Sequence, residues 1–405
     1  MTTRKLAARL LPFLLGLYIV AFIDRINLGF AALTMNRELA ITSQQFGFAA
    51  GIFFLGYFVF EVPSNLILHR IGARVWMARI LITWGVIATL TGFVQSPRQL
   101  YVARFALGVA EAGYFPGIVH YLGYWFRQRE KALAIAVIIM GIPLASIIGA
   151  PASGLILDHV HWLGLSSWRW LFVLEGFPAV IGALLAGVVL PSRPEDAAFL
   201  SAEEKRGVIE GIAEEDRGKR PVSVVQALVN PRVLLLAAMG FCHAFGQYTF
   251  NFWMPQILKS TLGGVSNTMV GLLVAVPNLI GLAAMIVVCR HSDRTMERRY
   301  HMVISIALGG IALVFLGVPR SPIETVMLFS LAAIGAYCFL PIFFTVPGAF
   351  LTGYSAAAGI ALIASVSNLG GFAGPWVVGE IHQRGLVIAG VLYLVSAVLA
   401  FRTIP

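Results

Sequence analysis

Twelve apolar runs are spread over the 405 residues of this chain. One helical crossing of a bilayer takes about 20 consecutive apolar residues. Only 12% of the residues are charged, whereas a soluble domain has about 25%. The sequence therefore predicts an all-α integral membrane protein with twelve transmembrane helices. We place them at residues 10–33, 46–68, 75–95, 99–123, 132–157, 168–190, 232–257, 268–290, 301–318, 323–348, 355–380 and 385–402.

The net charge of +10 follows the order of the runs and does not resemble a nucleic-acid surface. Basic residues concentrate in every second gap between runs, and loops rich in Lys and Arg stay on the cytoplasmic side of a membrane. We therefore expect a multi-pass protein of the cell (inner) membrane with both termini in the cytoplasm. Its partners would include the lipid bilayer but no nucleic acid. The basic residues concerned are Arg4, Lys5, Arg9, Arg70, Arg74, Arg127, Arg129, Lys131, Arg290, Arg294, Arg298 and Arg299.

The amino terminus is basic and then apolar, as a signal peptide is, but its apolar run is too long and contains Asp24 and Arg25. We therefore expect an uncleaved first helix. The three cysteines, Cys242, Cys289 and Cys338, lie in or beside apolar runs, so we expect no disulfide.

A charged stretch at 191–228 interrupts the apolar pattern and divides the runs six and six. Within it, Ser201 and Glu204 form a capping box that predicts a short surface helix. We therefore predict a first half at 1–190, a cytoplasmic linker at 191–230 and a second half at 231–405. Similar basic segments follow the second run (65–74) and the eighth (289–299), which indicates an internal repeat typical of secondary transporters.

The two basic segments, "NLILHRIGAR" and "CRHSDRTMERR", resemble the Gly, Asp, Arg, Gly, Arg loop signature of the major facilitator superfamily. The first copy is degenerate, because Asn65 replaces the first Gly and His69 the Asp. The alternative is that both are simply basic cytoplasmic loops. The residues that we assign to gating or to this structural motif are Glu61, Arg70, Arg74, Asp293 and Arg294.

Other segments narrow the resemblance to the anion:cation symporter family of that superfamily: "DRINLGFA", "RFALGVAEAGYFPG", "WRWLFVLEGFPA", "RPEDAAFLSAEEK" and "NFWMPQIL". That family includes bacterial sugar-acid, tartrate and aromatic-acid permeases and the vesicular glutamate transporters. The resemblance implies two pseudo-symmetric six-helix halves and proton-coupled uptake of a small organic anion.

Charged residues inside the first and fourth runs carry the mechanism that we expect. A charge at the bilayer centre costs about 2.5–3.5 kcal/mol on insertion scales, so Asp24 and Arg25 need partners. Arg104 and Glu111 lie seven residues apart, two helical turns on one face, with Gly108 between them to admit another helix. We expect these four charges to meet at one depth and neutralise one another.

A buried carboxyl group beside an arginine can bind a proton in one conformation and release it in another. We therefore assign Asp24 and Glu111 as proton carriers and Arg104 as the switch that pairs with the ionised acid. The alternative is a structural ion-pair network, although buried ion pairs contribute little stability compared with apolar packing.

Arg25 is our candidate clamp for a substrate carboxylate, because a guanidinium stays charged and grips a carboxylate with two hydrogen bonds. The family resemblance implies the same role; the alternative is that Arg25 only balances Asp24. Tyr57 and Glu61 share a face of the second run. Tyr57 would contact the anion or pack as an ordinary aromatic, and for Glu61 we favour gating or structural pairing over proton transfer.

The second half contains polar side chains but no acid or arginine well inside its runs. We expect it to recognise substrate hydroxyl groups through Gln247 and Asn251, which share one helix face, and through Asn368. His243 extends that stripe, but a lone histidine on a helix is more often a structural residue. Phe343 and Phe344 would wall the cavity or pack in the core.

No loop combines Ser, His and Asp, and no Cys/His spacing suits a metal, so we expect neither an enzyme nor a cofactor. The sequence predicts a proton-coupled symporter of a small organic anion that works by alternating access as a monomer. The open alternatives are a sodium-coupled or uncoupled carrier and, more remotely, a membrane-embedded enzyme or a channel.

Overall fold

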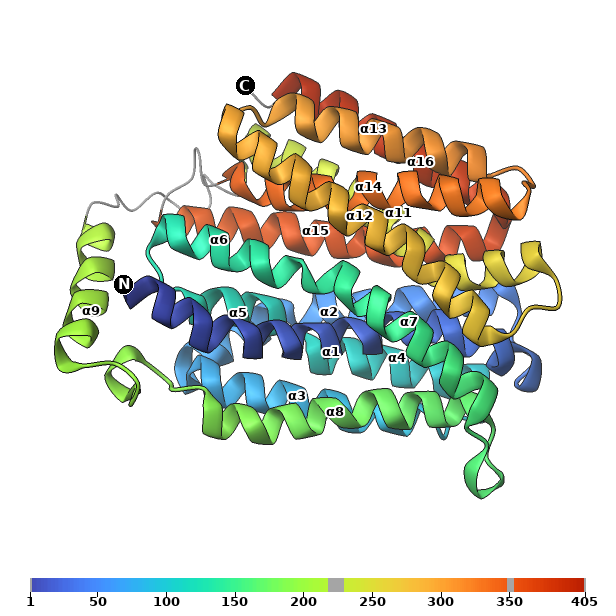
Figure 1. Cartoon of the computed structure of the whole chain (residues 1–405), viewed down its shortest axis with the longest axis horizontal. Coiled ribbons are helices and arrows are strands. Elements are labelled where there is room, and N and C mark those ends of the chain that lie inside the picture. Colours follow the sequence, from blue (N-terminus) through green and yellow to red (C-terminus); the bar gives the residue numbers. More distant parts are fainter. Residues whose placement is uncertain (1, 218–228, 348–352, 404–405) are drawn as a thin grey trace.

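The computed structural model describes residues 2–217, 229–347 and 353–403. Every regular element in these ranges is a helix, and the helices form twelve segments that are long and apolar enough to cross a membrane. Figure 1 shows them running side by side along the long axis of the molecule. The predicted all-α fold with twelve spans is confirmed.

The first six spans are built from eight helices because two spans are interrupted. The fourth span consists of α4 and α5, and the fifth of α6 and α7. The bounds are α1 Thr2–Glu38, α2 Ser43–Ile71, α3 Ala73–Thr91, α4 Pro97–Glu111, α5 Tyr114–Leu122, α6 Gln128–Ile139, α7 Gly141–His159 and α8 Ser167–Val189, with a 3-10 turn at Trp162–Gly164.

The last six spans are single helices: α11 Pro231–Leu262, α12 Asn267–Thr295, α13 Arg299–Leu316, α14 Pro322–Thr345, α15 Gly353–Ile381 and α16 Gln383–Thr403. Between the halves lie a 3-10 turn at Pro194–Asp196 and the surface helix α9, Ala202–Arg217. The predicted capping box is present: the Ser201 amide donates to Glu204 Oε2 (2.8 Å), and the Glu204 amide donates to Ser201 Oγ (3.2 Å).

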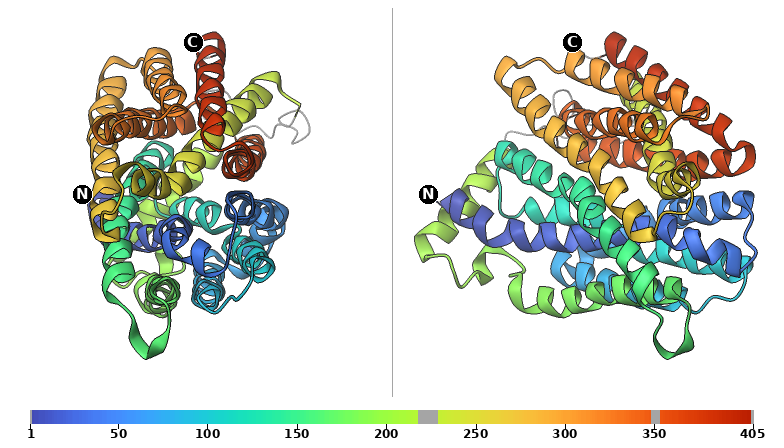
Figure 2. Two further views of the ribbon diagram at one scale, coloured as in Figure 1. Left: turned by 90° about the vertical axis from the view of Figure 1, so that its right-hand side faces the viewer. Right: turned by 45° about the vertical axis from the view of Figure 1, so that its right-hand side comes forward.

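The two halves pack against each other through equivalent helices. In the contact between them, α7 packs on α12 and α2 packs on α15, so the second and fifth spans of each half meet the fifth and second of the other. Figure 2 shows the groups α1–α8 and α11–α16 side by side. This exchange of equivalent contacts is the pattern expected of a duplicated six-helix unit.

The two ends of the helix bundle differ in which parts of the chain lie there. Both chain ends and α9 lie at one end, which we call the terminal face (Figure 1). At the other end, the opposite face, the halves touch through backbone. A Cβ atom on Gly47 or Gly51 of α2 would lie 2.5 Å from the carbonyl oxygen of Pro375 or Phe372 of α15. These glycines permit a contact that larger residues would prevent.

The fourth span breaks immediately after Glu111, where the sequence predicted a continuous helix. α4 ends at Glu111, and Gly113 has φ +84°, a left-handed conformation that glycine adopts at little cost. A Cβ atom there would also collide with Ser64 of α2. The break places a carboxyl group at a helix terminus in the middle of the membrane.

Candidate functional site

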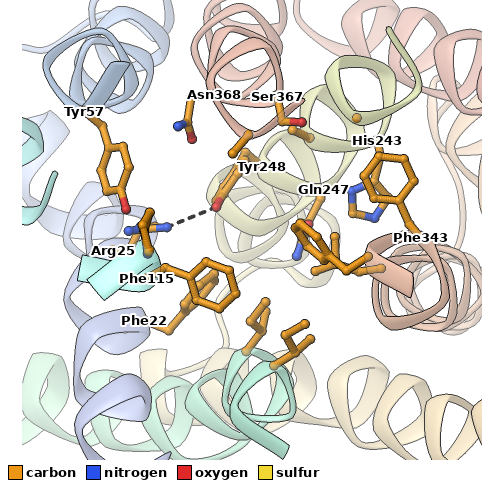
Figure 3. A pocket seen from close by; sticks show the side chains of 18 of the residues that line it. Phe22, Arg25, Tyr57, Phe115, His243, Gln247, Tyr248, Phe343, Ser367 and Asn368 are labelled. Atoms are coloured by element: carbon orange, nitrogen blue, oxygen red, sulfur yellow. Dashed lines mark hydrogen bonds between the residues drawn. The ribbon is translucent and has the colours of Figure 1, made fainter. Parts of the chain in front are cut away.

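A cavity of about 120 Å³ lies between the two halves, halfway along the bundle. Its wall combines aromatic rings with a few polar groups, as in sites that bind small organic molecules. Figure 3 shows Arg25 and Tyr57 on one side and Gln247, His243 and Asn368 across from them. Phe343 and Phe344 line the cavity, as the sequence suggested. The lining residues with side chains that matter below are Tyr18, Phe22, Arg25, Tyr57, Glu61, Gln247, Tyr248, Ser367 and Asn368.

Arg25 of α1 is the central residue of this cavity. Its Nη2 atom donates to the Glu111 carboxylate in a direct ion pair, and its Nη1 atom donates to Tyr248 Oη of α11 at 3.2 Å. Of the described lining residues, Arg25 is the one permanent cation. The guanidinium therefore links the acid of one half to a hydroxyl group of the other.

Aromatic rings surround the Arg25 guanidinium and hold its plane. The guanidinium carbon lies 5.0 Å from the ring centres of Phe22 and Phe53 and 5.6 Å from that of Tyr57. A cation over an aromatic face is stabilised by the ring quadrupole, and more strongly where water is excluded. The Arg25 side chain is only 13% exposed, and the Glu111 side chain is fully buried.

α2 and α4 pack closely together beside this ion pair. A Cβ atom on Gly108 would overlap the carbonyl oxygen of Phe53, so glycine is needed for the two helices to touch. The expectation that Gly108 admits a neighbouring helix is confirmed, and that helix is α2.

Glu61 connects the halves on the α2 side of the cavity. It is buried, and its Oε2 atom accepts hydrogen bonds from Ser365 Oγ and Asn368 Nδ2 of α15, both at 3.2 Å. Asn368 therefore lines the cavity while it is engaged with Glu61. Tyr57, four residues earlier on α2, lines the same wall.

The candidate hydroxyl readers of α11 lie at different places. Gln247 lines the cavity, and its Nε2 atom has no hydrogen-bond partner in the described structure. Asn251, one turn closer to the opposite face, is buried outside the lining. His243 touches the cavity, but its Nε2 atom contacts the Ala336 carbonyl at 2.8 Å and its ring stacks between Phe339 and Tyr393. These contacts agree with a structural role for His243.

Asp24 and Arg104 lie behind the cavity wall. Both are buried, and neither is among the described lining residues. Arg104 lies over the Phe53 ring at 5.0 Å, and none of its three guanidinium nitrogens has a hydrogen-bond partner among the described residues. From the sequence we expected these two residues to meet Arg25 and Glu111 in one cluster of four charges. In this structure, the direct ion pair among the four is that of Arg25 with Glu111.

Comparison with known proteins decides the family. The family model described as Major Facilitator Superfamily matches residues 14–375. The chain belongs to the Major Facilitator Superfamily. Members of this superfamily are membrane transporters and not enzymes.

Relatives within the superfamily match almost the whole chain. A protein of Agrobacterium vitis named as a tartrate transporter is 44% identical, over 99% of this chain and 93% of its own length. NicT of Pseudomonas putida, named as a metabolite transport protein, is 40% identical over 96% of this chain and 92% of its own.

Solved structures of the superfamily share the fold. A bacterial homologue of the human lysosomal transporter Spinster, in an inward-facing and unoccupied conformation, has a TM-score of 0.75 at 18% identity, covering 97% of this chain and 96% of its own. The xylose transporter XylE of E. coli, in a partially occluded inward-open conformation, also scores 0.75, at 14% identity, with 98% of both chains covered.

The superfamily's loop signature lies at the terminal-face ends of the helices. Arg70 is in the last turn of α2 and Arg74 in the first turn of α3. Asp293 and Arg294 end α12, and Asp293 pairs with Arg298 (2.7 Å) across the turn to α13. Their gating role stays a prediction.

Some site residues were not singled out from the sequence. Tyr248 was only one polar residue of its span, and the aromatic partners of Arg25 had no distinguishing pattern. Glu175 could have been found, because an acid inside an apolar run is the signal that singled out Asp24 and Glu111. It is 7% exposed in α8.

Proposed function

We propose that this chain is a proton-coupled symporter that takes up a small organic anion by alternating access. The observation that carries the proposal is the Arg25–Glu111 ion pair beside the cavity. A substrate carboxylate would bind the Arg25 guanidinium, but one nitrogen of that group, Nη2, already donates to Glu111. Substrate and ionised Glu111 therefore compete for one guanidinium.

This competition couples the substrate to the proton. When Glu111 binds a proton it no longer needs Arg25, and the freed donors can form two parallel bonds with a substrate carboxylate. When Glu111 loses the proton, its carboxylate forms the ion pair with Arg25 again, and the substrate is released. Tyr248 and Tyr57 would hold the guanidinium in reach during the exchange.

The rest of the cavity suits the body of such an anion. Hydroxyl and amide groups of Tyr57, Gln247 and Ser367 line one part of it and Phe22 another. We propose a hydroxylated acid such as tartrate, in line with the 44% identical relative, with sugar acids and aromatic carboxylates as the other classes to test.

We propose that residues 1–190 and 231–405 move as two halves, joined by the linker 191–230, and that the protein works as a monomer in the cell (inner) membrane. Residues 218–228 of the linker lie outside the described residues. The basic gaps support a cytoplasmic terminal face. The close contacts at the opposite face support a state that is closed to the outside.

Uptake by purified protein in proteoliposomes tests the proposal. Labelled tartrate, a sugar acid and an aromatic carboxylate are each offered with an inward proton gradient, with an inward sodium gradient and with neither. Accumulation with the proton gradient alone supports proton symport. Accumulation that needs sodium, or mere equilibration under every gradient, would refute it in favour of the sodium-coupled or uncoupled carrier.

A further inference from the structure

A second polar cluster lies behind the cavity wall, between α1, α7 and α8. It consists of Asp24, Asn27, Ser153 and Glu175, all at most 7% exposed and none among the described lining residues. Ser153 Oγ donates to Glu175 Oε1 at 2.6 Å, and Asn27 Nδ2 lies 3.4 Å from Asp24 Oδ1. The Asn27 amide lies beside Glu175, and the two carboxyl groups are close enough to interact electrostatically.

Three acceptor atoms of the cluster lack a hydrogen-bond partner within the described ranges, although the indole N–H of Trp84, itself without a partner there, lies beside Asp24. Asp24 Oδ2, Asn27 Oδ1 and Glu175 Oε2 are buried and have no hydrogen-bond partner among the described residues. An ionised carboxylate is an acceptor only, whereas a protonated one also donates. A proton on one of these acids would supply a missing donor, so the arrangement favours at least one protonated acid.

Nearby charges lead to the same conclusion. Neither acid has an ion-pair partner among the described residues, and the cation that reaches Asp24 electrostatically is Arg104. From α3, Trp84 lies beside Asp24, and Thr89 lies beside Gly176, the residue that follows Glu175. Neither is charged. The interior of this half thus contains more acids than arginines: Asp24, Glu61, Glu111 and Glu175 against Arg25 and Arg104.

An excess of buried negative charge is costly in a membrane. With two arginines and four ionised acids the net charge would be −2, so electrical neutrality requires two protons on the acids and one more for each negative charge of a bound substrate. Glu111 shares the charge of Arg25, and Glu61 accepts two hydrogen bonds from the other half. Asp24 and Glu175 have no direct cation, and each has a carboxyl oxygen without a hydrogen-bond partner among the described residues, so we expect these two acids to hold protons.

The four residues of the cluster lie at successive distances from the opposite face. At 1.5 Å per residue, Ser153 lies about 9 Å from the end of α7 at that face and Glu175 about 12 Å from the start of α8. Asn27 and Asp24 lie about 16 and 21 Å from the end of α1. Arg25 and Glu111 are at the depth of Asp24.

We propose that Glu175 is a proton-binding residue of the transport cycle, which takes its proton from the opposite face and passes it to Asp24. This step takes place when Asp24 is ionised: the O–H bond of the Glu175 carboxyl group breaks and one forms on the Asp24 carboxylate, so charge is conserved and only water is needed to deliver the proton. Ser153 is a positioning residue that fixes one oxygen of Glu175. The proposal rests on the proposed proton coupling.

The test combines a ligand-free measurement with transport. Infrared difference spectra of the purified protein, recorded between acidic and basic pH, should contain the C=O band of a protonated carboxyl group that Glu175→Gln removes. In proteoliposomes, the same variant should retain tartrate counterflow within about twofold, while accumulation driven by a proton gradient falls toward equilibration, a loss of up to roughly fifty-fold per uncoupled proton at 100 mV.

Further variants separate proton binding from folding. Glu175→Asp keeps a carboxyl group and should restore part of the accumulation. Ser153→Ala should shift the pH dependence of accumulation. Glu203→Gln, the same change on the exposed face of α9, should change nothing.

Three results would overturn the proposal: an infrared titration that Glu175→Gln leaves unchanged, unchanged accumulation in that variant, or an equal loss of counterflow and accumulation that Glu175→Asp does not repair. If the wild-type protein accumulates none of the labelled organic acids under a proton gradient, the proposed function is refuted. The infrared measurement would still decide whether Glu175 binds a proton.

Discussion

The Asp158 carboxylate at the end of α7 accepts two hydrogen bonds from Thr268 in the first turn of α12, one from its amide and one from its hydroxyl, both at 2.7 Å. The other carboxylate oxygen accepts from the Asn267 amide (3.1 Å) and side chain (2.8 Å). One half thus provides a negatively charged cap for a helix of the other half, where the helix dipole favours it. This contact joins the two halves at the opposite face.

Asp158→Ala should shift the protein toward the state that is open at the opposite face. Loss of a helix cap costs about 0.5–2 kcal/mol, which corresponds to a change of roughly two- to thirtyfold in the ratio of closed to open states. Gln44 and Glu380 hydrogen-bond across the same face at 2.8 Å, so cysteines at these positions report closure. In a chain without its three native cysteines, a short dimaleimide should cross-link this pair more slowly in the Asp158→Ala variant.

Asp196→Asn provides the control, because Asp196 is an exposed residue of the linker. Its cross-linking rate should equal that of the parent chain. An unchanged rate in Asp158→Ala would mean that the backbone contacts of Gly47 and Gly51 close this face without the cap.

Glu111→Gln should separate substrate exchange from accumulation. The amide imitates protonated Glu111, leaves Arg25 free for the substrate and cannot release a proton. We expect tartrate counterflow to persist and gradient-driven accumulation to fail, with up to roughly fifty-fold accumulation per proton forfeited at 100 mV. In addition, substrate affinity should weaken with rising pH in the wild type but stay constant in the variant.

Counterflow, accumulation and affinity are measured on the same purified Glu111→Gln protein. A structural ion pair predicts a different result, namely poor folding and an equal loss of all three. Undiminished accumulation would remove Glu111 from the mechanism and leave Asp24 and Glu175.

The twelve spans and the buried charges could be predicted from the sequence because each depends on a local property. An apolar run of sufficient length must be a helix in lipid, and a charge within it is costly wherever its helix lies. Asp24, Arg25, Arg104 and Glu111 were therefore found without knowledge of the packing.

Which charges touch could not be predicted, because that depends on the rotation of each helix about its axis and on contacts between the halves. Asp24 and Arg25 are neighbours in sequence, yet Arg25 faces the cavity and Asp24 faces the cluster with Glu175. The Tyr248 contact requires the second half to be in place. The space at Gly113 is limited by Ser64 of α2, a residue almost fifty positions away.

Tyr248→Phe should weaken substrate binding without affecting the fold. The ring packs 4.3 Å from Phe54, and that contact survives the substitution, while the acceptor for Arg25 Nη1 is lost. Arg25 then turns more fully toward Glu111, and we expect affinity for tartrate to fall about three- to tenfold. Calorimetric titration measures this, with Tyr300→Phe on the exposed surface as the control. Equal affinities in the two variants would exclude a role of the hydroxyl group.

Gly108→Ala should destabilise the first half. The added Cβ atom meets the Phe53 carbonyl oxygen, a backbone atom that cannot rotate away, and overpacking of this kind costs about 1–3 kcal/mol. Gly207→Ala is the matched control, since a Cβ atom on Gly207 of α9 meets nothing within 4 Å. Thermal unfolding in detergent should therefore show a lower midpoint for Gly108→Ala and an equal or higher one for Gly207→Ala. An unchanged midpoint in Gly108→Ala would show that α2 and α4 can separate at no cost.

Arg25→Lys should keep the charge of the cavity yet lose most substrate binding. An ammonium group cannot form two parallel hydrogen bonds with a carboxylate, and it cannot reproduce the planar contact with the rings of Phe22 and Phe53. It can still pair with Glu111, so the variant should fold and unfold at nearly the wild-type temperature. We expect affinity for tartrate, measured by calorimetry in detergent, to fall by about tenfold or more, as for the loss of 1.4 kcal/mol. Arg37→Lys, on the exposed part of α1, controls for the change of residue type. Wild-type affinity in Arg25→Lys would show that charge alone suffices, and that Arg25 is the counter-ion of Glu111 but not the clamp of the substrate.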